Sequence, residues 1–152
     1  MANYLNLSEK SAEQGKGRLP KLVGNIRPVV ALNSTRTIFD HESGTIFTLD
    51  DAPGAFDVTL PAGKAGLYFS FVLGNATTND IRIVAVGADR MRGSVVNASA
   101  GDIGDNAVSA DFKVIFNATP SSFGDNLEIY CTGTRWICRG MTAATNAMVF
   151  AS

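Results

Sequence analysis

Apolar side chains recur at every second position in several short runs of the chain, and this period of two is typical of half-buried β-strands. The clearest run is residues 67–73, where Leu67, Phe69, Phe71 and Leu73 share one face. Similar runs predict strands at 56–60, 81–86, 112–116, 127–131 and 136–138, and weaker ones at 38–39, 46–49, 95–96 and 148–150. In the run at 81–86, apolar side chains on both faces indicate either two-sided burial or a bulge.

Clusters of Gly, Pro, Asn and Asp separate these runs and predict turns at 51–54, 62–66, 75–80, 101–106 and 124–126. No convincing amphipathic helix of ten residues occurs, and the small, polar segment 140–147 is predicted as a loop. Eight or more short strands with this spacing favour an all-β fold. We expect an antiparallel β-sandwich or a jelly-roll-like module at residues 37–152.

Residues 1–36 have a different character and are predicted to form an extended N-terminal arm. Pro20 and Pro28 each force an extended backbone on the preceding residue, and the short apolar groups of this segment cannot form a core alone. The arm is therefore expected to lie on another surface. The residues expected to contact that surface are basic or apolar: Arg18, Leu22, Val23, Arg27, Val29 and Val30.

The arm and the rest of the chain carry opposite net charge. Residues 1–36 contain six basic and two acidic side chains, for a net charge of +4, whereas the other 116 residues contain seven basic and twelve acidic ones, for a net charge of −5. The whole-chain value of −1 hides this division. A cationic tether joined to an anionic body is typical of a protein that attaches to a partner, most simply to acidic surfaces of its own kind.

Several classes of partner are not expected. No segment approaches the roughly 18–20 apolar residues that cross a bilayer, and the N-terminus lacks the pattern of a signal peptide. The basic residues of the arm are diluted by apolar ones, and Tyr4 is the only aromatic residue there. We therefore predict neither a membrane nor a nucleic-acid partner.

Cys131 and Cys138 flank the predicted hairpin tip at residues 132–135. A two-residue loop, Gly133-Thr134, places Cys131 opposite Trp136 and Cys138 opposite Ile129. The two sulfur atoms then lie diagonally, with Cα atoms about 7–8 Å apart. Disulfide partners usually lie within about 7 Å, so we expect two buried free thiols; a three-residue loop would reopen the question.

Candidate catalytic and metal-binding groups do not form recognisable sites. His41 is the only histidine, and its neighbours Asp40 and Glu42 are expected in a polar strand end or turn. No Gly-x-Ser-x-Gly elbow or phosphate-binding loop occurs. The spacing of Asp102, Asp105, Asp111 and Asp125 does not match the twelve-residue calcium loop. We predict no catalytic residues, no cofactor and no metal.

Five segments resemble structural proteins of tailed bacteriophages, especially the head decoration, or cement, proteins. They are residues 56–62 (FDVTLPA), 66–72 (GLYFSFV), 80–83 (DIRI), 124–129 (GDNLEI) and 133–140 (GTRWICRG). The resemblance covers roughly residues 45–140. It implies a non-enzymatic virion protein, made in the host cytoplasm, that sits on the capsid exterior. Its implied partners are the major capsid protein and other copies of itself in a homotrimer, with the arm spanning neighbouring capsid subunits.

The main alternative is a tail-fibre or receptor-binding module, because some of these modules share the same strand-and-turn patterns. Loops at 75–79 and 101–106 would then contact a glycan on the host surface. That alternative predicts exposed aromatic platforms, for which Tyr68, Tyr130 and Trp136 are the candidates. The absence of heptads in residues 1–36 argues against a coiled-coil stem. Whether the arm holds a capsid subunit or a sister copy stays open at this point.

Overall fold

The computed structural model describes residues 26–98, 102–106 and 111–152, which form twelve strands and one short 3-10 helix. The strands are β1 (Val29–Leu32), β2 (Arg36–Thr37), β3 (Ile46–Leu49), β4 (Phe56–Thr59), β5 (Tyr68–Leu73), β6 (Ile81–Val84), β7 (Arg90–Asn97), β8 (Asp102–Asn106), β9 (Lys113–Phe116), β10 (Asn126–Cys131), β11 (Arg135–Thr142) and β12 (Met148–Ala151). The 3-10 helix η1 (Asp40–Glu42) follows β2.

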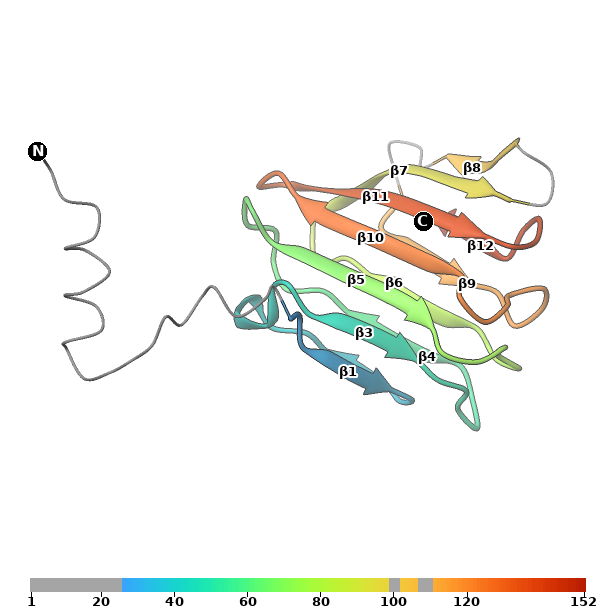
Figure 1. Ribbon diagram of the computed structural model, residues 1–152. Coiled ribbons are helices and arrows are strands. Elements are labelled where there is room, and N and C mark those ends of the chain that lie inside the picture. Colours follow the sequence, from blue (N-terminus) through green and yellow to red (C-terminus); the bar gives the residue numbers. More distant parts are fainter. Residues whose placement is uncertain (1–25, 99–101, 107–110) are drawn as a thin grey trace, which may run out of the picture.

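Two sheets pack face to face, as the sequence predicts (Figure 1). The larger sheet has the order β1-β3-β5-β10-β11-β7-β8, and the smaller one has the order β12-β9-β6-β4-β2. The all-β sandwich is therefore confirmed.

The sheets are mixed rather than purely antiparallel. From β1 to β6 the chain alternates between the two sheets, so every second strand returns to the same sheet in the same direction. The neighbours β1–β3, β3–β5, β2–β4 and β4–β6 are consequently parallel. Alternating hydrophobicity reveals which face of a strand is buried, but it does not reveal which way the neighbouring strand runs, and this explains the difference from the expected antiparallel order.

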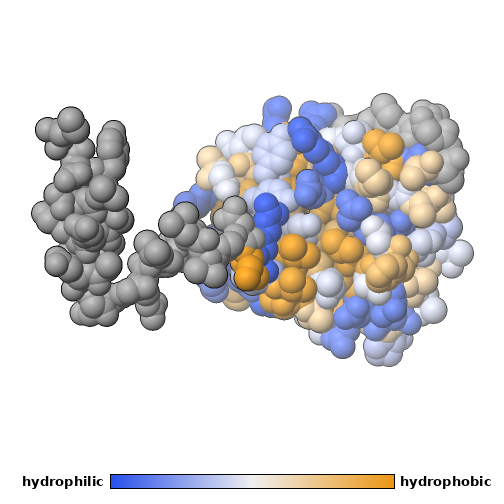
Figure 2. All heavy atoms as spheres, in the orientation of Figure 1, coloured by the Kyte–Doolittle hydropathy of each residue, from blue (hydrophilic) through white to orange (hydrophobic). Residues whose placement is uncertain are grey.

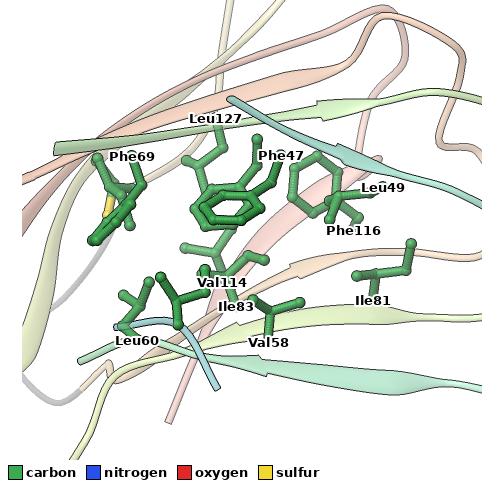
Figure 3. Close-up of a cluster of buried hydrophobic side chains, with 14 of the residues drawn as sticks. Phe47, Leu49, Val58, Leu60, Phe69, Ile81, Ile83, Val114, Phe116 and Leu127 are labelled. Carbon is green, nitrogen blue, oxygen red and sulfur yellow. The ribbon is translucent and has the colours of Figure 1, made fainter. Parts of the chain in front are cut away.

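The core consists of the inward-facing side chains of both sheets (Figure 3). Phe47 and Leu49 of β3 and Phe69 of β5 point from the larger sheet toward Val58 of β4 and Ile83 of β6. All five side chains are fully buried. Trp136, one of the three candidates for an exposed aromatic platform, is instead fully buried beside Phe69, with ring centroids 6.0 Å apart. This dry layer is the main stabilising contribution, because apolar burial scales with the area removed from water.

Most predicted strands are found where the period of two places them. Two strands were not predicted: β8 forms where a turn was expected at 101–106, and β1 lies in the expected arm. The other differences occur at strand ends. Residues 38–39 were expected in a strand, but the strand is β2, and Ile38 follows it with its N–H donated to Thr59 O at 2.8 Å. Residue Val86 lies beyond the end of β6 and is exposed, so neither two-sided burial nor a bulge is needed there. Strand β11 continues to Thr142 and so includes the first three residues of the predicted loop.

The sandwich begins earlier than the expected boundary between residues 36 and 37. Strand β1 pairs with β3 along its whole length, and Arg36 of β2 pairs with Val58 of β4. Residues 26–36 therefore belong to the folded body. The first 25 residues of the expected arm lie outside the described residues.

Strands β7 and β11 approach each other closely at Gly93. This residue has a φ of +145° and lies directly opposite Cys138 in the parallel ladder. A Cβ atom at this position would overlap the backbone carbonyl of Cys138, which cannot move without breaking the ladder. Glycine is therefore required here by both conformation and space.

We predict that Gly93→Ala lowers the free energy of unfolding by about 3 kcal/mol or more, because backbone strain and overpacking add. Urea unfolding followed by tryptophan fluorescence measures this loss. Gly124→Ala is the matched control, since Gly124 also has a positive φ, +91°, but open space around it. The control should cost about 1–2 kcal/mol. Equal losses in the two variants would show that the close approach is unimportant.

Candidate interaction surface at the N-terminal end of the sandwich

The 3-10 helix η1 lies at the end of the sandwich where the described chain begins (Figure 1). Residues just before and just after it help to line two open hollows. We call the residues that line them the N-terminal corner. The larger hollow, of about 610 Å³, is lined by residues 37–40 and 60–64 and by Val86. The smaller one, of about 390 Å³, is lined by Ile26, Arg27, Pro28, Ser43, Gly44 and Tyr68.

Large apolar side chains are exposed at this corner. Ile26 is 85% exposed, Phe39 is 54% exposed and Val86 is 41% exposed. The ring of Phe39 stacks on that of His41, with centroids 5.6 Å apart and planes 9° from parallel. Isolated exposed apolar residues are ordinary, but several around a hollow are typical of an interaction site.

The polar residues of η1 hold this corner in shape. The backbone N–H of Phe39 donates to Glu42 Oε2 at 2.9 Å, and Glu42 also forms an ion pair with Arg36. Lys64 Nζ lies 3.8 Å from Asp40 Oδ2 across the larger hollow. The prediction that Asp40, His41 and Glu42 form a polar turn is therefore confirmed. Their carboxylates fix the turn that presents Phe39 to solvent.

The structure divides the six predicted contact residues into three groups. Arg18, Leu22 and Val23 lie outside the described residues. Arg27 and Val29 are exposed, and the guanidinium carbon of Arg27 lies 4.8 Å from the centre of the Tyr68 ring. Val30 instead packs against the core of its own chain, so its side chain stabilises the sandwich itself.

A row of apolar and cationic side chains crosses the outer face of the larger sheet next to this corner. Tyr68 of β5 pairs directly with Tyr130 of β10, which pairs with Ile137 of β11, which pairs with Arg92 of β7. Arg27 covers the Tyr68 end. The two tyrosines therefore lie side by side on an accessible face, with a cation at either end of the row.

Tyr68 is held in place by its hydroxyl group, which donates to Glu128 Oε1 at 2.8 Å. Partial burial, and this bond to a carboxylate, raise the pKa of Tyr68 above its ordinary value. The phenol therefore stays neutral at physiological pH and remains a hydrogen-bond donor. Tyr130 is 36% exposed.

Four arginines gather on β7 and β11 beyond the tyrosine pair: Arg90, Arg92, Arg135 and Arg139. Arg135 lies directly opposite Arg90 in the ladder, and like charges in this position repel. Arg90 donates to the carbonyl oxygens of Gly87 and Asp89. Figure 2 shows the resulting contrast on this face: apolar residues gather on its β1 and β3 side, and hydrophilic ones cross its β10 and β11 side.

The two cysteines are free and buried, and their register is the predicted one. Cys131 pairs with Trp136 and Cys138 with Ile129, around the two-residue loop Gly133-Thr134. Burial raises the pKa of Cys138 to about 12. These thiols therefore act as small apolar residues of the core.

The acidic residues of the described chain serve local structure. Both carboxylate oxygens of Asp125 accept backbone N–H groups, from Ser122 at 2.9 Å and from Ala143 at 2.8 Å. Two hydrogen bonds from Thr78 lower the pKa of Asp51. Across residues 26–98 and 111–152, no group of three His, Cys, Asp or Glu side chains is arranged to hold a metal ion. The described part also contains no helix long and apolar enough to span a membrane.

No known protein family, curated protein or solved structure matches this chain.

Sequence reasoning missed the exposed positions of Phe39 and Val86 at the corner, and the pairing of the two tyrosines in the row. Phe39 was assigned to a strand, although its polar neighbours at 40–42 are a signal for a turn that would expose it. Val86 follows the alternation of β6 and gave no signal that the strand ends before it. Tyr130 was named as a candidate, but its pairing with Tyr68 depends on the neighbouring strand, which the sequence does not identify.

The Cys138 thiol generates a pH-dependent prediction. In the unfolded chain it ionises near pH 9, whereas in the folded protein it does so near 12. The contribution of the neutral, buried Cys138 thiol to the free energy of unfolding is therefore present below pH 9 and is lost as the pH rises from 9 toward 12. Between pH 9 and 11, the unfolding free energy of Cys138→Ala should fall less steeply than that of the unsubstituted chain, by about 1.4 kcal/mol per pH unit. Ile129→Val, which trims the cross-strand neighbour, is the control and should keep the original slope; equal slopes in all three proteins would contradict the prediction.

Proposed function

We propose that this protein is a non-enzymatic structural component of a virion that binds the outer surface of a capsid and stabilises contacts between major capsid subunits. The observation that carries the proposal is the N-terminal corner. Apolar Ile26, Phe39 and Val86 are exposed around two hollows at the end of the sandwich where the described chain begins. The arm and the corner can therefore contact one partner together.

The charges of the chain support the same proposal. Residues 1–25 contain four basic and two acidic side chains, and fully extended they would span at most about 80–90 Å. A cationic segment of that length can reach acidic sites on several neighbouring subunits. Linked contacts of this kind raise avidity without any single strong site. Binding that occurs only to the expanded capsid stabilises that state by mass action.

We predict that deleting residues 1–25 weakens binding to mature capsids about tenfold or more, because the linked contacts are lost. All described strands lie between residues 29 and 151, so the shortened chain should keep its unfolding midpoint. Cosedimentation with purified capsids measures the binding. In the full-length chain, Phe39→Ala should weaken it about thirtyfold, as expected for an anchor worth about 2 kcal/mol.

Phe123→Ala is the matched control for this experiment. Phe123 is 77% exposed, but it lies in the loop before β10, far from the corner. The start of β10 is at the opposite end of the sheet from Tyr130, which pairs with Tyr68 of the corner. Its loss should leave capsid binding unchanged. Full decoration by both the shortened chain and the Phe39→Ala variant would overturn the proposed use of the arm and the corner.

A glycan-binding module of a tail fibre is the second candidate function, and the paired tyrosines favour it. Tyr68 and Tyr130 lie next to each other on an accessible sheet face, and Arg27 and Arg92 lie at the ends of the same row. Aromatic faces flanked by polar groups suit the apolar face and hydroxyl groups of a sugar ring. The row on the sheet face, rather than the segments 75–79 and 101–106 that were expected as loops, would then be the contact site.

For this second function, Tyr130→Ala should weaken attachment to host cells or to immobilised glycans about five- to tenfold, because stacking area is lost. Met141→Ala is the control, since Met141 is exposed on the same face but outside the row. No measurable attachment by the full-length chain, or equal attachment by the two variants, would exclude the tyrosine row as a glycan site.

A further inference from the structure

Strand β1 has one open edge among the described residues. The carbonyl oxygens of Pro28 and Leu32 accept hydrogen bonds from Ile46 and Asp50, at 2.9 and 2.8 Å, on the β3 side. Successive residues of a strand direct their backbone groups to opposite sides. The N–H and C=O groups of Val29 and Ala31 therefore point away from β3, toward the open edge.

Within the part of the chain that the structure describes, this edge lacks the features that usually protect a sheet edge. Its sequence, VVAL, contains no charged residue and no proline, and Val29 is 63% exposed on the outer face. At the other side of the sandwich, by contrast, β8 of the larger sheet lies against β12 of the smaller one, so the two sheet edges cover each other. An uncovered, uncharged edge strand is a template for another strand.

We propose that β1 of a second copy of this chain fills this edge, in an antiparallel pair related by a two-fold axis at Val30. In this register Val29 of each copy lies opposite Ala31 of the other. Each of these two pairs exchanges two hydrogen bonds, so all four outward N–H groups are satisfied. The two larger sheets then continue as one sheet across the interface.

The sequence of the strand fits a pair of identical copies. Pro28 lacks an N–H, but its backbone faces β3, so the interface loses nothing. Arg27 lies opposite Asn33 of the other copy rather than opposite another arginine, so like charges are kept apart. The side chains of Val29 and Ala31 meet across the axis and extend the apolar area beside Ile46.

A two-fold interface of this kind is closed, because each copy uses its only β1 edge. The assembly therefore contains two copies, not the three that the resemblance to decoration proteins implies. It forms without a capsid, so its test is separate from that of the proposed function.

Sedimentation equilibrium of the full-length chain tests the assembly. We expect a mass twice the 16.0 kDa of one chain. Ala31→Pro removes an outward N–H while leaving the β3 side intact. It should raise the dissociation constant at least about tenfold, since each of the two Val29–Ala31 pairs loses one hydrogen bond. Ala31→Val, which keeps the N–H, is the matched control and should remain paired. Circular dichroism should show the same fold in both variants.

A cysteine at the axis tests the register independently. Residue 30 of one copy would lie opposite residue 30 of the other, with Cα atoms about 4.5 Å apart, which permits a disulfide. Under mild oxidation Val30→Cys should give a linked pair on a non-reducing gel, whereas Val96→Cys, exposed on the far side of the same sheet, should not. The proposal is overturned by a monomer at all concentrations, by a trimer without the link at residue 30, or by a dimer that Ala31→Pro leaves intact. A monomer would leave the edge to residues 1–25 or to a capsid subunit.

Discussion

The face-to-face burial of two apolar sheet surfaces is the constraint on which the rest of this structure depends. Strands β1, β3, β4, β5 and β6 each have one apolar face, and the chain buries these faces against one another by crossing between the two sheets after each strand. Crossing in this way makes the neighbouring strands parallel. The later strands β9 to β12 complete both sheets mainly through antiparallel pairs, whereas β11 also runs parallel to β7.

This alternation between the sheets also determines which described strands lie at the sheet edges. A chain that coils between two sheets begins with one strand in each, and here these first strands, β1 and β2, form the edges on one side. Because β1 carries apolar side chains instead of charged ones, the outward N–H and C=O groups of this edge can pair with a further strand. The exposed corner around Phe39 is next to these edge strands, since η1 connects β2 to β3, the neighbour of β1. Edge and corner are therefore two consequences of one topology, and they can serve two different partners.

The sequence predicts the local features of this fold better than its connections. The alternation Leu67, Phe69, Phe71 and Leu73 identifies a buried strand face, and Gly133-Thr134 determines the register of Cys131 and Cys138. Neither pattern contains information on which strand lies alongside, so the parallel order and the Tyr68–Tyr130 pair had to come from the structure. Val29 and Val30 show the same limit within the candidate site. Adjacent and chemically identical, they were both predicted as contacts, yet one faces solvent and the other packs on the core.

The central claim is that another chain completes the β1 edge, and amide hydrogen exchange resolved residue by residue tests it most directly. Val30 and Leu32 donate toward β3 and provide an internal reference for protected amides. In concentrated solution, we expect the amides of Val29 and Ala31 to exchange as slowly as these two, and to become fast on dilution as the copies separate. Rapid exchange of Val29 and Ala31 at every concentration would contradict the claim.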